Sequence, residues 1–212
     1  MKRISGVYVI TDVELMPGRT HAQIAEAALA GGAKIIQIRD KNAGDRDFYE
    51  DALELRKLTS DAGAMLAVND RVDVAAAVGA DMVNVGQTDL PMSAARKVLG
   101  DNVIIGVSAD NEEQALQAQK DGADYVGFGP VFPTETKVDT GPVSGLETLK
   151  RVCGEVSIPV VAIGGIGTDN IASVAAAGAA CAAVVSAVVC AEDMAEAASE
   201  LIRKFDSGRG GR

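Results

Sequence analysis

Residues 65–85, MLAVNDRVDVAAAVGADMVNV, contain the pattern from which the fold is predicted. Two short apolar runs, Met65–Asn69 and Met82–Val85, have the composition of strands and enclose a helical stretch. The pair Gly79-Ala80 ends that stretch, because glycine takes up the left-handed conformation that closes many helices. Neither run alternates strictly between apolar and polar residues, which indicates strands covered on both faces and therefore a parallel sheet.

The same unit of strand, helix and strand recurs along the chain. Gly32-Ala33, Gly122-Ala123 and Gly178-Ala179 repeat the helix end, so that each interval between these pairs holds two strand–helix units. The predicted strands are Val7–Thr11, Ile35–Arg39, Met65–Asn69, Met82–Val85, Val103–Ser108, Tyr125–Gly127, Val160–Ile163 and Ala182–Ser186. An open, doubly wound sheet is the alternative, but eight units without a sign of reversed strand order favour closure. We predict an α/β fold, a single (β/α)8 TIM barrel over residues 1–206, followed by a disordered tail over residues 207–212.

Composition and charge exclude several classes of protein. The 212 residues include 20 Lys and Arg against 30 Asp and Glu, a formal charge of −10, so nucleic acid and anionic membranes are poor partners. Apolar residues make up 48% of the chain, which excludes disorder. The three cysteines share no metal-ligand spacing and are expected to be reduced, in a cytoplasmic protein. Residues 171–191 are uncharged and long enough to cross a bilayer, but their Ala-rich sequence is better explained by a buried helix and strand.

Two aspartates follow neighbouring predicted strands. In a parallel barrel the carboxyl ends of all strands open on one face, so Asp70 and Asp89 should lie close together. Two carboxylates completed by substrate phosphate oxygens are ligands that suit Mg²⁺. The alternative is that each aspartate caps the helix that follows it, near Arg71 and Pro91.

Three cations, Arg39, Lys41 and Lys137, fall on loops of the same face in an otherwise acidic chain. A single lysine is usually ordinary solvated surface, but three cations that converge would bind a multiply charged anion. The only histidine, His21, has no carboxylate or nucleophile partner visible in the sequence. Catalysis by a Ser-His pair and histidine-rich metal sites are therefore excluded.

Two loops complete this face. Gly164–Gly167, with Val185-Ser186 after the next strand, matches the monophosphate cradle that barrels build after strands seven and eight. A tight turn that needs glycine is the alternative. The long loop from Gly129 to Lys137 contains Thr134 and Thr136 and is long enough to be a lid over the barrel mouth; a plain connection is the alternative.

Taken together, these motifs resemble those of the thiamine phosphate synthase family over nearly the whole chain. The motifs that carry the resemblance are Gln37–Lys41, Asn69-Asp70, Val85–Leu90, Gly106–Ser108, Gly129–Lys137 and Ile163–Ile166. Members of this family are (β/α)8 barrels that join hydroxymethylpyrimidine diphosphate to a thiazole monophosphate, forming thiamine monophosphate and releasing diphosphate. The resemblance implies a Mg²⁺-dependent transferase of thiamine biosynthesis that acts on small-molecule substrates, and it is compatible with a homo-oligomer.

The resemblance also implies a role for each candidate residue. The pyrimidine diphosphate would be held by Gln37, Arg39, Lys41, Asn69, Ser108 and Lys137. The thiazole phosphate would be held by Thr134, Thr136, Gly165, Val185 and Ser186, and the Mg²⁺ by Asp70 and Asp89. The expected catalytic residues are Lys137, Arg39, Lys41 and Ser108. The expected mechanism needs no protein nucleophile, because departure of the diphosphate leaves a pyrimidine cation that the thiazole nitrogen captures.

The chain departs from the family pattern at three positions. Asp40 stands where the family usually has Glu, Asn84 where it often has His, and Asp110 where it commonly has His. Similar thiazole tautomerases use a histidine near the position of Asp110, so its absence favours the synthase. Two alternatives stay open. One is a phosphate-binding barrel isomerase, which would need a general acid and base but no Mg²⁺. The other is a non-catalytic regulatory relative that binds thiamine precursors.

Overall fold

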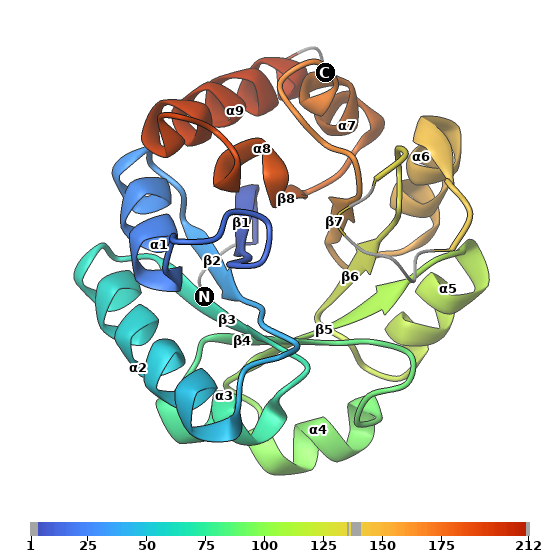
Figure 1. Ribbon diagram of the computed structural model, residues 1–212. Coiled ribbons are helices and arrows are strands. Elements are labelled where there is room, and N and C mark those ends of the chain that lie inside the picture. Colours follow the sequence, from blue (N-terminus) through green and yellow to red (C-terminus); the bar gives the residue numbers. More distant parts are fainter. Residues whose placement is uncertain (1–3, 135, 137–140, 211–212) are drawn as a thin grey trace.

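The computed structural model describes residues 4–134, 136 and 141–210. Eight parallel strands pair in chain order, and the first pairs with the last, so that the sheet closes (Figure 1). The strands are β1 Gly6–Thr11, β2 Ile35–Ile38, β3 Met65–Asn69, β4 Met82–Val85, β5 Ile104–Ala109, β6 Tyr125–Phe128, β7 Val160–Ile163 and β8 Cys181–Val184. The predicted (β/α)8 barrel is confirmed.

Helices surround the barrel and alternate with its strands (Figure 1). They are α1 His21–Ala30, α2 Asp45–Asp61, α3 Val72–Val78, α4 Met92–Leu99, α5 Glu112–Lys120, α6 Gly145–Glu155, α7 Ile171–Ala177, α8 Ser186–Val189 and α9 Met194–Arg209. Residues 171–191 form α7, β8 and the short α8, as the interpretation of a buried helix followed by a buried strand predicts. No helix in the described part of the chain is long and apolar enough to cross a membrane.

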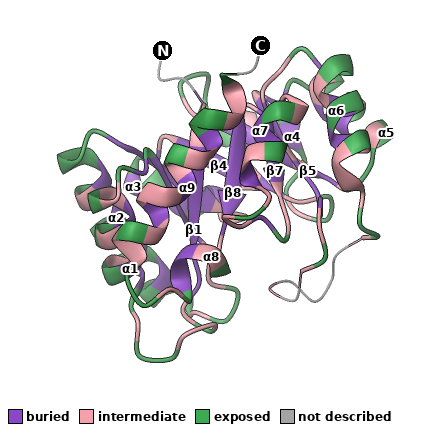
Figure 2. Cartoon of the chain, turned by 90° about the horizontal axis from the view of Figure 1, so that it is seen from above, coloured by how far each residue is buried: buried purple, intermediate pink, exposed green. Residues whose placement is uncertain are grey.

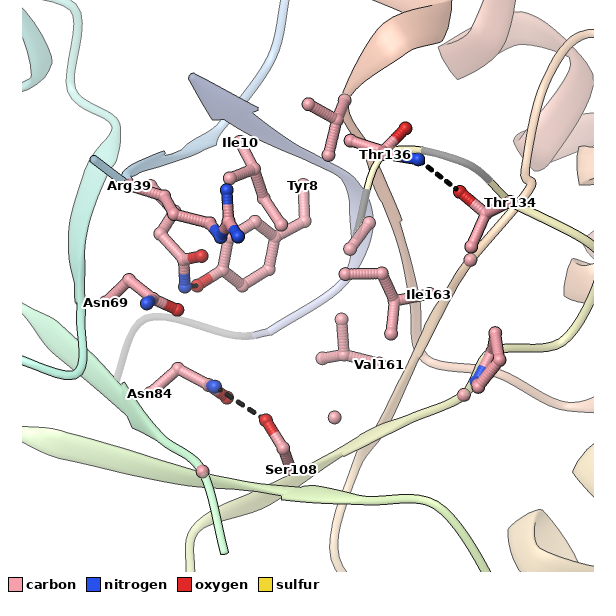
Figure 3. A pocket seen from close by; sticks show the side chains of 18 of the residues that line it. Tyr8, Ile10, Arg39, Asn69, Asn84, Ser108, Thr134, Thr136, Val161 and Ile163 are labelled. Carbon is pink, nitrogen blue, oxygen red and sulfur yellow. Dashed lines mark hydrogen bonds between the residues drawn. The ribbon is translucent and has the colours of Figure 1, made fainter. Parts of the chain in front are cut away.

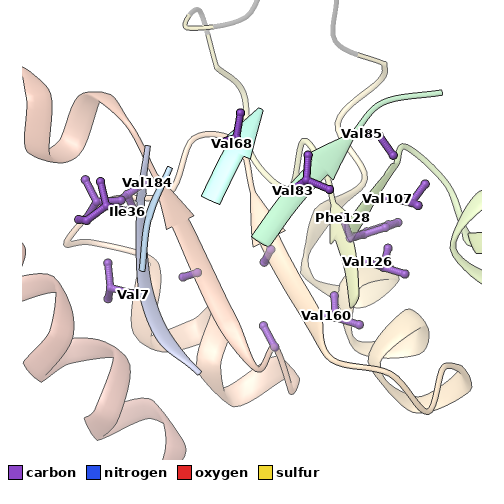
Figure 4. Packing of buried hydrophobic residues seen from close by; sticks show 14 of the residues in the cluster. Val7, Ile36, Val68, Val83, Val85, Val107, Val126, Phe128, Val160 and Val184 are labelled. Atoms are coloured by element: carbon purple, nitrogen blue, oxygen red, sulfur yellow. The ribbon is translucent and has the colours of Figure 1, made fainter. Parts of the chain in front are cut away.

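Alternate strand residues pack on opposite sides of the barrel wall, as the two-residue period of a strand requires. On β1, Val7 and Val9 face the helices, whereas Tyr8 and Ile10 face the interior. Figure 4 shows residues of the outward layer, mostly β-branched side chains such as Val7, Val83 and Val160, which belong to one apolar cluster with residues of the helices. Strands are buried on both sides, and exposed residues concentrate on the outer faces of the helices (Figure 2). The inward layer is apolar towards the amino ends of the strands and becomes polar towards their carboxyl ends.

A repeated ion pair lies at the amino ends of β4 and β6, directly after two of the Gly-Ala pairs. Asp81 and Asp124 each accept a hydrogen bond from the backbone N–H of the second residue in the preceding strand, at 3.0 and 2.7 Å. Each also pairs with an arginine from a helix, Arg56 or Arg96, at 2.6 Å. These part-buried pairs satisfy backbone groups on the face of the barrel opposite the strand carboxyl ends. In TIM barrels that amino-terminal face serves stability.

The last helix extends beyond the predicted end of the domain. α9 continues to Arg209, whereas the sequence predicted a disordered tail from residue 207. A Cβ on Gly208 would lie 2.2 Å from the carbonyl oxygen of Ala172, so glycine lets α9 lie directly against α7. The Arg209 guanidinium also lies 5.4 Å from the centre of the Phe205 ring. These tertiary contacts, which composition does not reveal, keep residues 207–209 helical.

Candidate active site

A cavity opens at the carboxyl ends of the strands (Figure 3). It is lined by every predicted site residue that the structure describes: Gln37, Arg39, Lys41, Asn69, Asp70, Asp89, Ser108, Thr134, Thr136, Gly165, Val185 and Ser186. Lys137 lies outside the described residues. The barrel thus brings together side chains that are far apart in the sequence, because parallel strands end on a common face.

The inner part of the cavity contains two tyrosines that the sequence did not single out. The amide nitrogen of Gln37 donates to the hydroxyl of Tyr8 at 2.7 Å, and the hydroxyl oxygens of Tyr8 and Tyr125 lie 3.5 Å apart. Burial raises the pKa of both phenols well above the usual value, so they remain neutral. A Cβ on Gly106 would lie 1.9 Å from the Tyr125 ring, so that ring occupies space that only glycine leaves. The period-two alternation of the strands, which turns Tyr8 inward, is the signal that could have identified these residues.

Asn84 was also missed as a site residue, although the sequence marked it as a departure from the family pattern. It faces the cavity from β4, in register with Asn69 on β3. Its amide nitrogen donates to the hydroxyl oxygen of Ser108 at 2.9 Å (Figure 3). The backbone carbonyl of Ser108 in turn accepts from the side-chain amide of Gln87 at 2.6 Å. A layer of polar inward-facing groups therefore lies just below the barrel rim.

Asp70 and Asp89 lie close together on that rim. The pKa of Asp70 is raised to about 6, first by burial and then by the carboxyl of Asp89 within hydrogen-bonding reach, although Lys41 and Arg39 act in the opposite direction. Asp70 is the one non-glycine residue in the described part of the chain with a positive φ, 60°. Asp89 is held by the backbone N–H of Gly86, which donates to its carboxylate at 2.7 Å. Two carboxylates are thus held at a spacing that is unfavourable when both are charged.

Neither aspartate caps the helix that follows it. The helices α3 and α4 have Arg71 and Pro91 at their N-caps, and neither helix start has a side-chain capping hydrogen bond. The capping alternative is therefore wrong for Asp70 and for Asp89. A pair of carboxylates beside two cations is a donor set that fits a hard divalent ion shared with an anionic ligand. The described residues contain no group of three or more His, Cys, Asp and Glu that could hold a metal, so water or substrate would complete the coordination.

Arg39 is held in place by a carboxylate that the sequence did not predict. Its guanidinium donates to Asp12 at 3.1 Å, and Asp12 is buried. The other carboxylate oxygen of Asp12 accepts from the backbone N–H groups of Glu14 and Leu15, at 3.0 and 3.3 Å. Asp12 therefore anchors Arg39 to the loop after β1. Arg39 has further N–H donors, because a guanidinium carries five.

The glycine-rich loop after β7 is a tight turn that needs glycine, and it also lines the cavity in which a phosphate cradle was predicted. Gly165 has a φ of 62°, and a Cβ there would lie 2.3 Å from the carbonyl oxygen of Pro133, so the turn and its packing require glycine. The backbone N–H of Gly167 donates to the side chain of Asn170 at 2.9 Å, and that N–H is therefore used within the turn. Gly165 itself lines the cavity. Its predicted contact with a phosphate stays a prediction.

Comparison with known proteins identifies the family. A family model described as thiamine monophosphate synthase matches residues 7–188. The chain belongs to the thiamine monophosphate synthase family. It is 54% identical over 195 residues to the thiamine-phosphate synthase of Chloroflexus aurantiacus, covering 92% of this chain and 90% of that protein. The thiamine-phosphate synthase of Methanospirillum hungatei is 50% identical over 200 residues, 94% of this chain and 95% of the relative.

A solved structure supports the same assignment. Thiamine phosphate pyrophosphorylase from Pyrococcus furiosus superposes with a TM-score of 0.87 at 45% identity and covers 96% of both chains. Membership of this family confirms the predicted class of enzyme, a transferase of thiamine biosynthesis that acts on small molecules.

The three departures from the family pattern lie in different surroundings. Asn84 and Asp110 line the cavity, whereas Asp40 does not. Burial raises the pKa of Asp40, but hydrogen bonds from the backbone N–H groups of Asn42 and Ala43, and the neighbouring His21, bring it below the usual value. The ring nitrogen Nε2 of His21 lies 3.5 Å from Asp40, so the expectation that this histidine has no carboxylate partner is wrong. The fold brings them together because β1 and β2 are neighbours. His21 still lies outside the cavity lining.

Proposed function

We propose that this chain couples 4-amino-2-methyl-5-hydroxymethylpyrimidine diphosphate to hydroxyethylthiazole phosphate, forming thiamine monophosphate and diphosphate. The observation that carries the proposal is the paired carboxylates Asp70 and Asp89 beside Arg39 and Lys41 in one cavity. Cations complement the diphosphate, and the two carboxylates would hold a divalent ion beside it. Family membership supports the same reaction.

The metal in this proposal is Mg²⁺, held by Asp70 and Asp89. The fit rests on the donor set, because two adjacent carboxylates repel each other unless a proton or a cation lies between them. When bound, Mg²⁺ supplies electrostatic stabilisation of the charge that develops on the departing diphosphate. Water and phosphate oxygens would fill the other positions, as is usual for this ion.

The side chains of the chain itself bind the diphosphate and shield the reacting centre. Asp12 fixes Arg39, whose guanidinium N–H groups that are not bonded to Asp12 donate to the departing diphosphate. Lys41 adds a second positive charge. Lys137, outside the described residues, is the third predicted cation. The neutral tyrosines and the apolar side chains of Val161 and Ile163 limit the water that could trap a pyrimidine cation.

The second substrate is assigned to the other side of the mouth. Thr134, Thr136, Gly165, Val185 and Ser186 are proposed to bind the thiazole phosphate. Their hydroxyl and backbone N–H groups are donors suited to a monophosphate.

A second candidate function, a barrel isomerase, is favoured by one observation. Asp70 has a pKa of about 6, which suits a general acid or base near neutral pH. An isomerase of this kind would work without a divalent ion. Dependence on Mg²⁺ therefore separates the two candidates.

The test incubates the purified chain with both phosphorylated precursors in Mg²⁺ or in EDTA, and quantifies thiamine monophosphate and diphosphate. We expect equal amounts of the two products in Mg²⁺ and almost none in EDTA. Equal product in EDTA would remove the metal from the proposal. An absence of thiamine monophosphate under both conditions would overturn the coupling function.

Location and assembly complete the proposal. The three cysteines form no disulfide in the described part of the chain, which supports a reducing compartment, the cytoplasm. A homo-oligomer stays a prediction from the resemblance. Measurement of the native mass by light scattering decides it.

A further inference from the structure

Asn84 and Ser108 form a hydrogen-bonded pair inside the cavity, of which the predicted site includes only the serine. Asn84 extends from β4 and Ser108 from β5, and their side chains point towards each other (Figure 3). The amide nitrogen of Asn84 donates to the hydroxyl oxygen of Ser108 at 2.9 Å. Gln87 binds the backbone carbonyl of Ser108 at 2.6 Å, so the serine is held at both its main chain and its side chain.

The direction of this hydrogen bond determines what Ser108 offers a ligand. A serine hydroxyl has one proton to donate and two lone pairs that accept. An amide nitrogen only donates, so the Ser108 oxygen is the acceptor and its proton takes no part in this bond. No group in residues 4–134, 136 and 141–210 accepts that proton. The hydroxyl is therefore available as a donor to whatever occupies the cavity.

Gly127 keeps this pair accessible. It lies next to Ser108 in the register of β5 and β6. A Cβ at this position would lie 3.4 Å from the amide oxygen of Asn84 and 3.9 Å from the hydroxyl oxygen of Ser108. Because glycine has no Cβ, both polar atoms remain open on that side. The pair thus presents an acceptor, the Asn84 oxygen, beside a donor, the Ser108 hydroxyl.

We propose that Asn84 selects the aminopyrimidine ring, through its own amide oxygen and through the hydroxyl of Ser108 that it orients. This inference rests on the proposed function. An aminopyrimidine carries an amino donor beside a ring-nitrogen acceptor, which complements the acceptor and donor of the pair. A 4-oxopyrimidine carries the reverse pattern, and a thiazole ring has no donor.

The position of the pair also suits the ring of the diphosphate substrate. Asn84 is in register with Asn69, the residue directly before Asp70. The pair therefore lies below the two carboxylates proposed to hold Mg²⁺ and the diphosphate. The apolar side chains of Val161 and Ile163 line the same cavity and can contact the face of a flat ring (Figure 3). A ring whose diphosphate is bound at the rim would reach this layer.

The test compares binding of two unreactive ligands of equal charge, the aminopyrimidine monophosphate and its 4-oxo counterpart, by calorimetry in Mg²⁺. We expect the unmodified chain to prefer the amino ligand by about 100-fold, because the oxo ligand leaves polar groups unpaired. Asn84→Ala should reduce this preference at least about tenfold. Asn84→Asp should abolish it, because a carboxylate makes Ser108 donate to it and turns the proton away from the ligand. The ratio of affinities cancels the effect of the added charge.

Ser108→Ala and the double variant Asn84→Ala/Ser108→Ala show whether the two residues act as one unit. We expect the double variant to lose little more preference than the Ser108→Ala variant, since contacts within one network are not additive. The control is Asn102→Ala, at an exposed position outside the cavity, which should retain the full preference. Melting curves establish that each variant is folded, and the isosteric Asn84→Asp provides the result should the alanine variant not fold.

The outcomes separate this inference from the function on which it rests. A chain that forms thiamine monophosphate but keeps the same ligand preference in both Asn84 variants would overturn the role of Asn84. A chain that binds neither ligand and forms no thiamine monophosphate would overturn the proposed function, and this inference with it.

Discussion

Replacing Asp70 by asparagine should stabilise the metal-free chain and remove its response to Mg²⁺. The carboxylate of Asp70 faces that of Asp89 and does not cap α3, so its removal relieves a repulsion without breaking a helix cap. Asparagine has the same shape and tolerates the φ of 60° at this position. Stabilisation by the loss of a proposed site residue is the opposite of the usual effect of a mutation.

The size of the effect follows from the pKa of Asp70. A pKa raised from 3.8 to about 6 corresponds to about 3 kcal/mol against folding once the group is charged. Solvent reaches part of this carboxylate and screens its charge, so we take about 1 to 2 kcal/mol. For a chain of this length, that raises the Tm by about 3 to 6 °C. Mg²⁺ at 100 times its Kd would stabilise the unmodified chain by about 2.7 kcal/mol and leave Asp70→Asn almost unaffected.

Scanning calorimetry at pH 7, in EDTA and in Mg²⁺, measures both effects. The control is Asp101→Asn, which changes the net charge equally at an exposed position and should leave the Tm and its response to Mg²⁺ unchanged. The reasoning would be refuted if Asp70→Asn lowered the Tm in EDTA, or if it kept the full shift on addition of Mg²⁺. Coupling activity of Asp70→Asn should fall by at least about 100-fold if the metal is needed.

Three further predictions concern the charge of Asp70, the packing at Gly106 and the ion pair of Arg96. In EDTA the Tm advantage of Asp70→Asn over the unmodified chain should shrink as the pH falls from 7 to 4.5. The pKa of Asp70 is about 6 in the folded state and lower in the unfolded state, so its charged carboxylate destabilises the fold fully above pH 6 and no longer near pH 4. Melting curves that differ equally at both pH values would contradict this. Gly106→Ala should destabilise the chain by about 3 kcal/mol in urea unfolding, because the new Cβ would lie 1.9 Å from the Tyr125 ring. An unchanged urea concentration at half unfolding would show that the ring moves freely. Arg96→Ala loses the hydrogen bonds to Asp124 and to two loop carbonyls and should lower the free energy of unfolding by about 2 kcal/mol. The folded variant should keep its coupling rate, and a folded but inactive variant would contradict a purely structural role for Arg96.

The sequence predicted the barrel because its strands are short, apolar and separated by helices. Met65–Asn69, Met82–Val85 and Val160–Ile163 have the predicted bounds. Other strand ends shifted, because a strand ends where its partner stops pairing rather than where its β-branched residues end. Thus β2 stops at Ile38, opposite Thr11, and Arg39 begins the loop that carries it to the cavity.

The rim of the site was predictable for a topological reason, and its interior was not. Residues after parallel strands meet on one face whatever their side chains, so Asp70 and Asp89 could be placed together by counting strand ends. Tyr8 and Asn84 lie within strands, where only the inward or outward direction of each residue and the register with the next strand reveal the cavity. The pairing of Asp12 with Arg39 depends on a loop conformation that no periodicity encodes.

The two ends of the barrel differ in how their charges are used. At the amino ends of the strands, Asp81 and Asp124 each satisfy a backbone N–H and pair with an arginine, so each of these charges has a partner and contributes to stability. At the carboxyl ends, Asp70 holds a left-handed backbone and faces a second carboxylate, an arrangement that costs stability and that the proposed cation would relieve. Substitutions at the two ends should therefore change stability in opposite directions. Arg96→Ala should lower the Tm and spare the reaction, whereas Asp70→Asn should raise the Tm and abolish it. Such a sign difference would not arise if both sets of charges served only the fold.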